Sequence, residues 1–197
     1  MKSLGGFSKT ELHEKIAIRE VKSFQLINIA MAAGIVLFAA ITLFLSKSKT
    51  IENAAVDGLP NFPILNFALI IIALLTYSTV YILPQILFTP SRLEKRFSNP
   101  FYNAQRNEII ETAAKLIQLY RTQMIVRLAL LEFVSMFALT LLFVSTMNGA
   151  AGNRPLVWLL LTPAFIQLMY TYKTFPTKEN IVEFIDANIV RKLRQAM

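Results

Sequence analysis

The chain has 197 residues and a net charge of +8, yet only 16% of its residues are charged and 55% are hydrophobic. A soluble domain usually carries about 25% charged residues, so this composition excludes an ordinary soluble domain. The chain has no cysteine, which excludes disulfides, thiolate metal sites and cysteine nucleophiles.

The first segment, residues 1–23, is polar and is predicted to form an amphipathic helix outside the membrane. Ser8 and Glu11 have the spacing of a capping box, in which the two side chains satisfy first-turn amides. The apolar run that follows begins only after about twenty mostly polar residues, and no small-residue cleavage site comes after it. We therefore expect an internal start-transfer helix and not a removable signal peptide.

Four apolar runs hold one acidic residue between them. They cover residues 24–46, 63–83, 125–147 and 155–172. Each has about 18–24 residues, the length that a helix needs to cross a hydrocarbon layer of about 30 Å. None shows the recurring polar face of a soluble bundle helix. The sequence therefore predicts an all-α, polytopic membrane protein with four transmembrane helices.

The four runs belong to a pattern that occurs twice in the chain: a polar helix, a span, a loop and a second span. The first hairpin is expected at 24–84 and the second at 125–176. The returning span of each is framed by prolines, at 63–84 and at 155–176. Two copies built this way run parallel to each other. Gene duplication and two hairpins obeying the same bilayer rules both explain the likeness, and the sequence leaves these alternatives open.

Prolines are also expected to set the ends of the returning spans. A proline suits the first turn of a helix, where its missing N–H needs no partner. Pro84 and Pro176 are each predicted to end a span where water takes over the backbone hydrogen bonds. Pro163, inside the fourth run, is expected to kink its helix.

The segment at 85–124 begins as an irregular loop interrupted by Pro90 and Pro100. An amphipathic helix follows, and its apolar stripe is predicted to continue into the third span as one long helix. After Pro176, Thr177 is expected to cap a third amphipathic helix within residues 177–197.

These apolar stripes have three possible destinations: the lipid headgroup layer, the other helices of the chain, or a partner. Interfacial helices usually have a basic polar face, whereas these faces mix acidic and basic residues, which favours packing of helix on helix. Leu116, Ile117 and Tyr120 are the candidates for partner contacts.

Basic residues predict the orientation. Seventeen of the twenty Lys and Arg residues lie in the polar segments, near the mouth of the third span, or at the C-terminal end. The two remaining connections hold only Lys47, Lys49 and Arg154. The positive-inside rule therefore places both termini in the cytoplasm.

Glu132 is the acidic residue within the apolar runs, about 10 Å inside the third span. Such a carboxylate normally faces protein or water. It is interpreted as a cation or proton site, as a contact at a subunit interface, or as a group that snorkels or pairs with Arg127 or Lys173. Gln167, Pro163 and Thr140 complete the polar candidates, together with Ser135 as part of a possible polar seam.

Catalytic and metal-binding patterns are missing from the sequence. His13 is the single histidine and lies outside the apolar runs, and no phosphate-binding glycine loop occurs. We expect no catalytic residue, metal site, cofactor or nucleic-acid partner. The expected partners are the lipid bilayer and other membrane-protein subunits, or further copies of the chain.

Three functions fit these observations. The first is a non-catalytic accessory, assembly or scaffold subunit of a membrane complex. The second is a small oligomeric transporter or channel with a polar site around Glu132. The third is a membrane-shaping protein, since two hairpins followed by an amphipathic helix resemble the reticulon plan in outline, although no motif residue carries that likeness.

Overall fold

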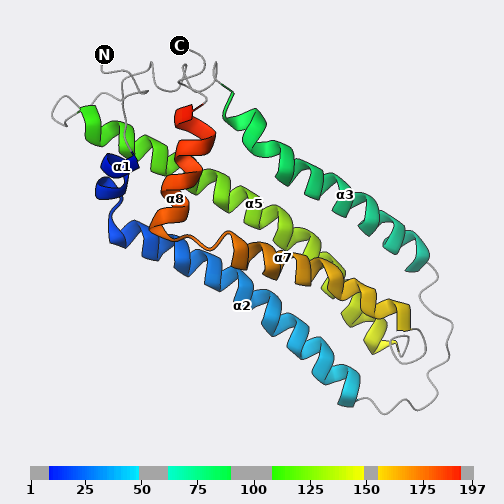
Figure 1. Ribbon diagram of the computed structural model, residues 1–197. Coiled ribbons are helices and arrows are strands. Elements are labelled where there is room, and N and C mark those ends of the chain that lie inside the picture. Colours follow the sequence, from blue (N-terminus) through cyan, green and yellow to red (C-terminus); the bar gives the residue numbers. More distant parts are fainter. Residues whose placement is uncertain (1–8, 49–61, 90–107, 149–154, 192–197) are drawn as a thin grey trace. The chain divides into compact units, whose positions relative to one another are not determined.

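The computed structural model describes residues 9–48, 62–89, 108–148 and 155–191, and these residues form helices and their connections, with no strand (Figure 1). The elements in chain order are α1 (Lys9–Lys15), α2 (Ile18–Ser48), α3 (Phe62–Leu87), α5 (Glu108–Met147), the 3₁₀ helix η2 (Pro155–Leu161), α7 (Thr162–Lys173), α8 (Lys178–Ile185) and the π-helical turn η3 (Asp186–Val190). The prediction of an all-α chain is confirmed.

Three helices of the described chain are long and apolar enough to cross a membrane. The spans lie at Ile18–Ser46 in α2, Ile64–Leu87 in α3 and Ala114–Met147 in α5. α5 is the long helix that the sequence predicts, since the amphipathic segment and the third apolar run form one helix of 40 residues. Three such helices indicate a multi-pass protein embedded in a membrane.

The fourth predicted span takes a different form from the other three. Residues 155–173 are helical, but they divide into the seven-residue 3₁₀ helix η2 and the twelve-residue α-helix α7. The change of helix type falls immediately before Pro163, which has no N–H to give to the carbonyl of Leu159. A 3₁₀ helix this long is uncommon, because its hydrogen bonds are poorer than those of an α-helix.

Pro84, which is predicted to end the second span, does not end its helix. α3 continues through Pro84 to Leu87, and the amide N–H of Phe88 still bonds to the carbonyl of Pro84 at 3.1 Å. The missing N–H of Pro84 leaves the carbonyl of Val80 without its usual helical donor. Arg127 of α5 supplies a donor instead, as described below.

The chain divides into two compact units. The polar unit comprises Met1–Ile27, Tyr81–Val126 and Thr174–Met197, and the apolar unit comprises Asn28–Val80 and Arg127–Lys173. The three pieces of the polar unit are the segments that the sequence marks as polar or amphipathic. Ser8, Pro90, Pro100 and Leu193 lie outside the described residues, as do the loops at 49–61 and 149–154.

One hydrophobic core holds the polar unit together, and all three of its chain segments contribute to it. The buried members are Ile16, Val21, Phe24, Phe88, Leu116, Ile117, Tyr120, Ile181, Val182, Ile185, Ile189 and Val190. The ring of Tyr120 lies edge-on to Phe24 at 5.6 Å and to Phe184 at 5.4 Å between centroids. The apolar stripes of this unit therefore pack on one another, as the mixed charge of their polar faces favours.

Local interactions fix the C-terminal helices of the polar unit. Thr177 caps α8 as predicted, because its hydroxyl accepts a hydrogen bond from the N–H of Asn180 at 3.2 Å. The carbonyl of Pro176, just before the cap, accepts a hydrogen bond from Nε2 of Gln25 at 3.1 Å. This hydrogen bond joins a side chain of α2 to the backbone just before α8.

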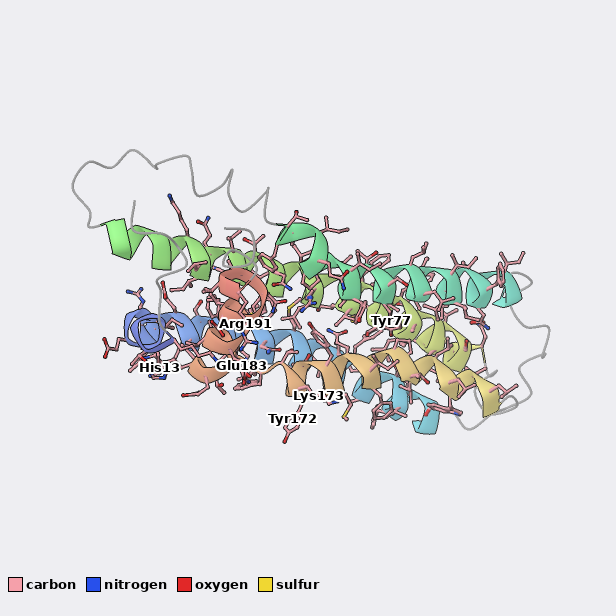
Figure 2. The ribbon with its side chains drawn as sticks, turned by 45° about the horizontal axis from the view of Figure 1, so that its top comes forward. His13, Tyr77, Tyr172, Lys173, Glu183 and Arg191 are labelled. Atoms are coloured by element: carbon pink, nitrogen blue, oxygen red, sulfur yellow. The ribbon has the colours of Figure 1, made fainter. Side chains whose placement is uncertain are left out.

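Ion pairs attach α1 to the C-terminal helices within the polar unit. Nζ of Lys9 lies 3.5 Å from Oδ2 of Asp186, and Nε2 of His13 lies 3.7 Å from Oε1 of Glu179. Arg191 also bonds to Asp186, at 3.2 Å. His13 and Arg191 are both labelled in Figure 2, where α1 and α8 appear next to each other.

The apolar unit has its own core, to which α2, α3, α5, η2 and α7 all contribute. Its buried members are Ile35, Leu69, Val134, Ala138, Leu139, Leu141, Leu142, Val157, Leu160 and Ala164. In the most apolar 18-residue stretch of each long helix, half of the residues are buried in α5, compared with 22% in α3 and 11% in α2. α5 is therefore the core helix of this unit, while α2 and α3 expose most of their apolar side chains.

Candidate polar site in the apolar unit

Arg127 joins two neighbouring helices of the apolar unit. Its Nε atom donates a hydrogen bond to the carbonyl oxygen of Val80 in α3, at 3.2 Å. Its guanidinium also interacts with the hydroxyl of Tyr170 in α7. A half-buried arginine thus has acceptors from two helices, which lowers the cost of holding its charge away from water.

A second polar contact joins α5 to α7. Oγ of Ser135, a fully buried residue, donates to the carbonyl oxygen of Pro163 at 3.0 Å. Hydroxyl donors of this kind join neighbouring helices in membrane proteins. Of the polar seam that the sequence suggests, Ser135 and Pro163 are brought together.

α7 turns one face into the unit, formed by Ala164, Gln167 and Thr171. These residues are spaced at three and four positions, so they follow one stripe of the helix. Gln167 is 0% exposed, and neither atom of its amide has a hydrogen-bond partner within the described residues. The hydroxyl of Thr171 is buried and also lacks a partner there.

The remaining polar candidates do not join this stripe. Glu132 is half-buried, and no ion pair joins it to Arg127 or Lys173 within the described part of the chain. Lys173 is exposed at the end of α7. Thr140 is exposed too, and its hydroxyl bonds to its own helix at the carbonyl of Met136, at 2.8 Å.

Asn28 in α2 is a polar residue that the sequence reasoning missed. Only 1% of its surface is exposed, and both atoms of its amide lack a partner among the described residues. Asn28, Ile35 and Thr42 are the buried positions of α2 within the apolar unit. Their spacing of seven residues marks the seam of a helix packed on a neighbour, and the structure is what shows that Asn28 belongs to it.

The three candidates for partner contacts lie in the polar unit and are buried there. Leu116 is 0% exposed, and Ile117 and Tyr120 are each 7% exposed. They pack in the same core as residues of α8. Contacts within the chain therefore account for their apolar character.

The described residues contain no group of three or more His, Cys, Asp or Glu side chains placed to hold a metal ion. The polar site is built instead from neutral amides and hydroxyls, with one guanidinium beside them. Such groups donate and accept hydrogen bonds. Comparisons with protein-family models, with curated proteins and with solved structures found no match for this chain.

Proposed function

We propose that the protein is a non-catalytic accessory, assembly or scaffold subunit of a membrane complex. One observation carries this proposal. In the most apolar 18-residue stretch of α2 only 11% of the residues are buried, and in that of α3 only 22%, although both helices contribute to a packed core. Their large exposed side chains include Leu37, Phe44 and Leu74. Lipid covers part of such a surface, and the proposed occupant of the rest is another membrane-protein subunit.

The polar unit supports the same function. It gathers three distant segments of the chain around one core, so it is a folded helical unit in its own right. Its outer surface carries both signs of charge, for example Arg19, Lys22 and Glu183, which are exposed. A surface of this kind suits reversible contacts with a soluble or membrane-bound protein.

We further propose that residues 155–173 form the fourth crossing. Seven residues at about 2.0 Å and twelve at 1.5 Å give η2 and α7 a combined length of about 32 Å, enough for a hydrocarbon layer of about 30 Å. Four crossings produce the two parallel hairpins of an internal repeat. They also return both termini to one side, which the positive-inside rule makes the cytoplasm.

The experiment that tests the subunit proposal is affinity purification in a mild detergent, followed by mass spectrometry. We expect one or a few larger membrane proteins to co-purify in a fixed ratio. The test variant is Leu37→Ala together with Leu74→Ala, which shortens exposed side chains of α2 and α3 without adding a charge or touching either core. Loss of the partners with this variant, at unchanged expression, supports the proposal. A wild-type chain that purifies alone or only with itself contradicts it.

The second candidate function is a small oligomeric transporter or channel. The buried amide of Gln167, which has no partner within the described residues, favours it, because polar groups held inside a membrane unit mark solute pathways in many transporters. Glu132 would carry the ion or proton in this case. Solute flux measured in proteoliposomes tests this function. Flux that is present in the wild-type chain and lost in Glu132→Gln supports transport, whereas the absence of flux in the wild-type chain contradicts it.

A further inference from the structure

The buried amide of Asn28 and the polar stripe of α7 are related by the arrangement of their helices. α2 and α7 lie alongside each other and run in opposite directions, in the views of both figures. Nε2 of Gln25 in α2 donates a hydrogen bond to the carbonyl of Pro176, three residues after the end of α7, at 3.1 Å. This contact gives a common reference from which to follow each helix.

Short steps from this contact lead to similar levels on the two helices. Asn28 lies three residues after Gln25, about 4.5 Å along its helix, and Thr171 lies five residues before Pro176. Because the helices are antiparallel, the two steps go in the same direction in space. Asn28 therefore lies close to the level of Thr171, with Gln167 one turn away along the same stripe.

The proposed internal repeat places Asn28 against α7 independently. Ser46 and Ser145 are equivalent at an offset of 99, so Asn28 is the equivalent of Arg127. Arg127 reaches across to α3, the returning helix of the first hairpin. If the repeat holds, the helix that faces Asn28 is α7, the returning helix of the second hairpin.

The side chains at this place share three properties. Asn28, Gln167 and Thr171 are each more than nine-tenths buried, each is uncharged, and each has a polar atom without a partner in the part of the chain described. Buried polar groups in native proteins are almost always paired, either with protein or with bound water. Two amides and a hydroxyl offer both donors and acceptors to one ligand.

We propose that Asn28, Gln167 and Thr171 form a hydrated binding site in the apolar unit for a small, uncharged, hydrogen-bonding ligand, of which water is the smallest. The charge of the surroundings supports an uncharged ligand. The cation beside the site is Arg127, which interacts with Tyr170 and already bonds to Val80. A free cation is disfavoured next to this guanidinium, and no carboxylate lies in the described parts of α7 or the apolar-unit part of α2 to offset it. Glu132 of α5 is half-buried and lies outside the polar stripe of α7.

The absence of cysteine from the chain makes the proposal testable by single cysteine substitution in the full chain in lipid vesicles. Asn28→Cys and Thr171→Cys are treated with a small, water-soluble methanethiosulfonate reagent. The control is Leu128→Cys, an equally buried apolar position that follows the equivalent of Asn28 at the offset of 99 and so lies at a similar depth. Only a thiolate in contact with water reacts, so we expect labelling about tenfold faster at positions 28 and 171 than at position 128. Equal, slow labelling at all three positions overturns the proposal.

A second variant keeps the proposal testable if the cysteine chains fold poorly. Gln167→Leu removes an amide while nearly conserving volume. If the amide binds a ligand, the substitution lowers the midpoint of thermal unfolding; if the amide is an unpaired group in a dry core, the midpoint rises. A raised midpoint contradicts the proposal. Neither result bears on co-purification with a partner, so this proposal and the proposed subunit function fail separately.

Discussion

Nε of Arg127 in α5 donates to the carbonyl oxygen of Val80 in α3 at 3.2 Å, and Val80 lies four residues before Pro84. In a regular α-helix the N–H of residue 84 would bond to that carbonyl. Proline has no N–H, so a side chain from another helix supplies the donor. The continuation of α3 beyond Pro84 thus depends on a tertiary contact.

This relationship predicts coupling between Arg127 and Pro84. Arg127→Met keeps the apolar stem but removes the donor, so it should destabilise the chain by about 1–3 kcal/mol, as expected for an unpaired buried carbonyl. Pro84→Ala restores the helical donor. The double variant should therefore be less destabilised than the two single variants added together, as measured by denaturant unfolding in micelles. Simple additivity would contradict the coupling.

Tyr120 gives a prediction about the polar unit. Its ring is buried between Phe24 and Phe184, so Tyr120→Ala should lower the free energy of unfolding by about 3–5 kcal/mol. The matched control is Gln118→Ala, at an exposed position on the same helix, which should have little effect. Thermal unfolding measures both. A stable Tyr120→Ala chain that loses a partner would instead show that Tyr120 is a binding residue.

The contact of α1 with α8 should depend on pH through Glu179. The N–H of Glu179 itself, the side chain of Thr177 and then His13 stabilise the carboxylate and hold the pKa of Glu179 below its ordinary value. A lowered pKa in the folded state means that the contribution to stability is present above the unfolded pKa. It is lost as the pH falls through the folded pKa.

Limited proteolysis within Lys9–Lys15 is the measurement for this pH dependence. Cleavage should increase as the pH is lowered from 6 to about 3, in the range where carboxylates protonate. Glu179→Gln should raise cleavage at pH 6 and reduce the dependence, while the ion pair of Lys9 with Asp186 still attaches α1. The control is Glu183→Gln, an exposed position on the same helix with no ion pair among the described residues. Identical profiles for the two variants would contradict the role of Glu179.

Thr177 gives a prediction for the start of α8. Thr177→Ala removes the side-chain acceptor of the Asn180 N–H and should cost about 0.5–2 kcal/mol, whereas Thr177→Ser should retain most of the stability. Hydrogen exchange of the first-turn amides of α8 reports the loss directly. Exchange that is unchanged in Thr177→Ala would show that the cap is unimportant.

The sequence predicts those parts of the fold that depend on local pattern. Helical periodicity is enough to predict that residues 108–147 form one helix, and Thr177 can be recognised as a cap from its neighbours. The apolar runs in α2 and α3 are recognisable by length and composition alone. Pro84 could not be interpreted in this way, because the donor that lets α3 continue comes from Arg127, 43 residues later in the sequence.

The candidate site was only partly predictable for the same reason. Gln167 stands out in the sequence because it is polar and lies inside an apolar run. Asn28 lies near the start of such a run, where a polar residue is expected at a membrane boundary, so its burial becomes evident only from the packing of α2. Glu132 draws attention through its charge, yet the structure leaves it half-buried and outside the polar stripe of α7.

The most direct test of the proposed subunit function is photo-crosslinking in native membranes. A photoreactive residue is placed at Leu37 of α2 or Leu74 of α3, which are 64% and 63% exposed, with Leu139 of α5 as the buried control. The subunit proposal predicts a covalent adduct with a different membrane protein from at least one of the exposed positions and none from Leu139. Adducts with lipid alone at both exposed positions, in a chain expressed at its normal level, would contradict it.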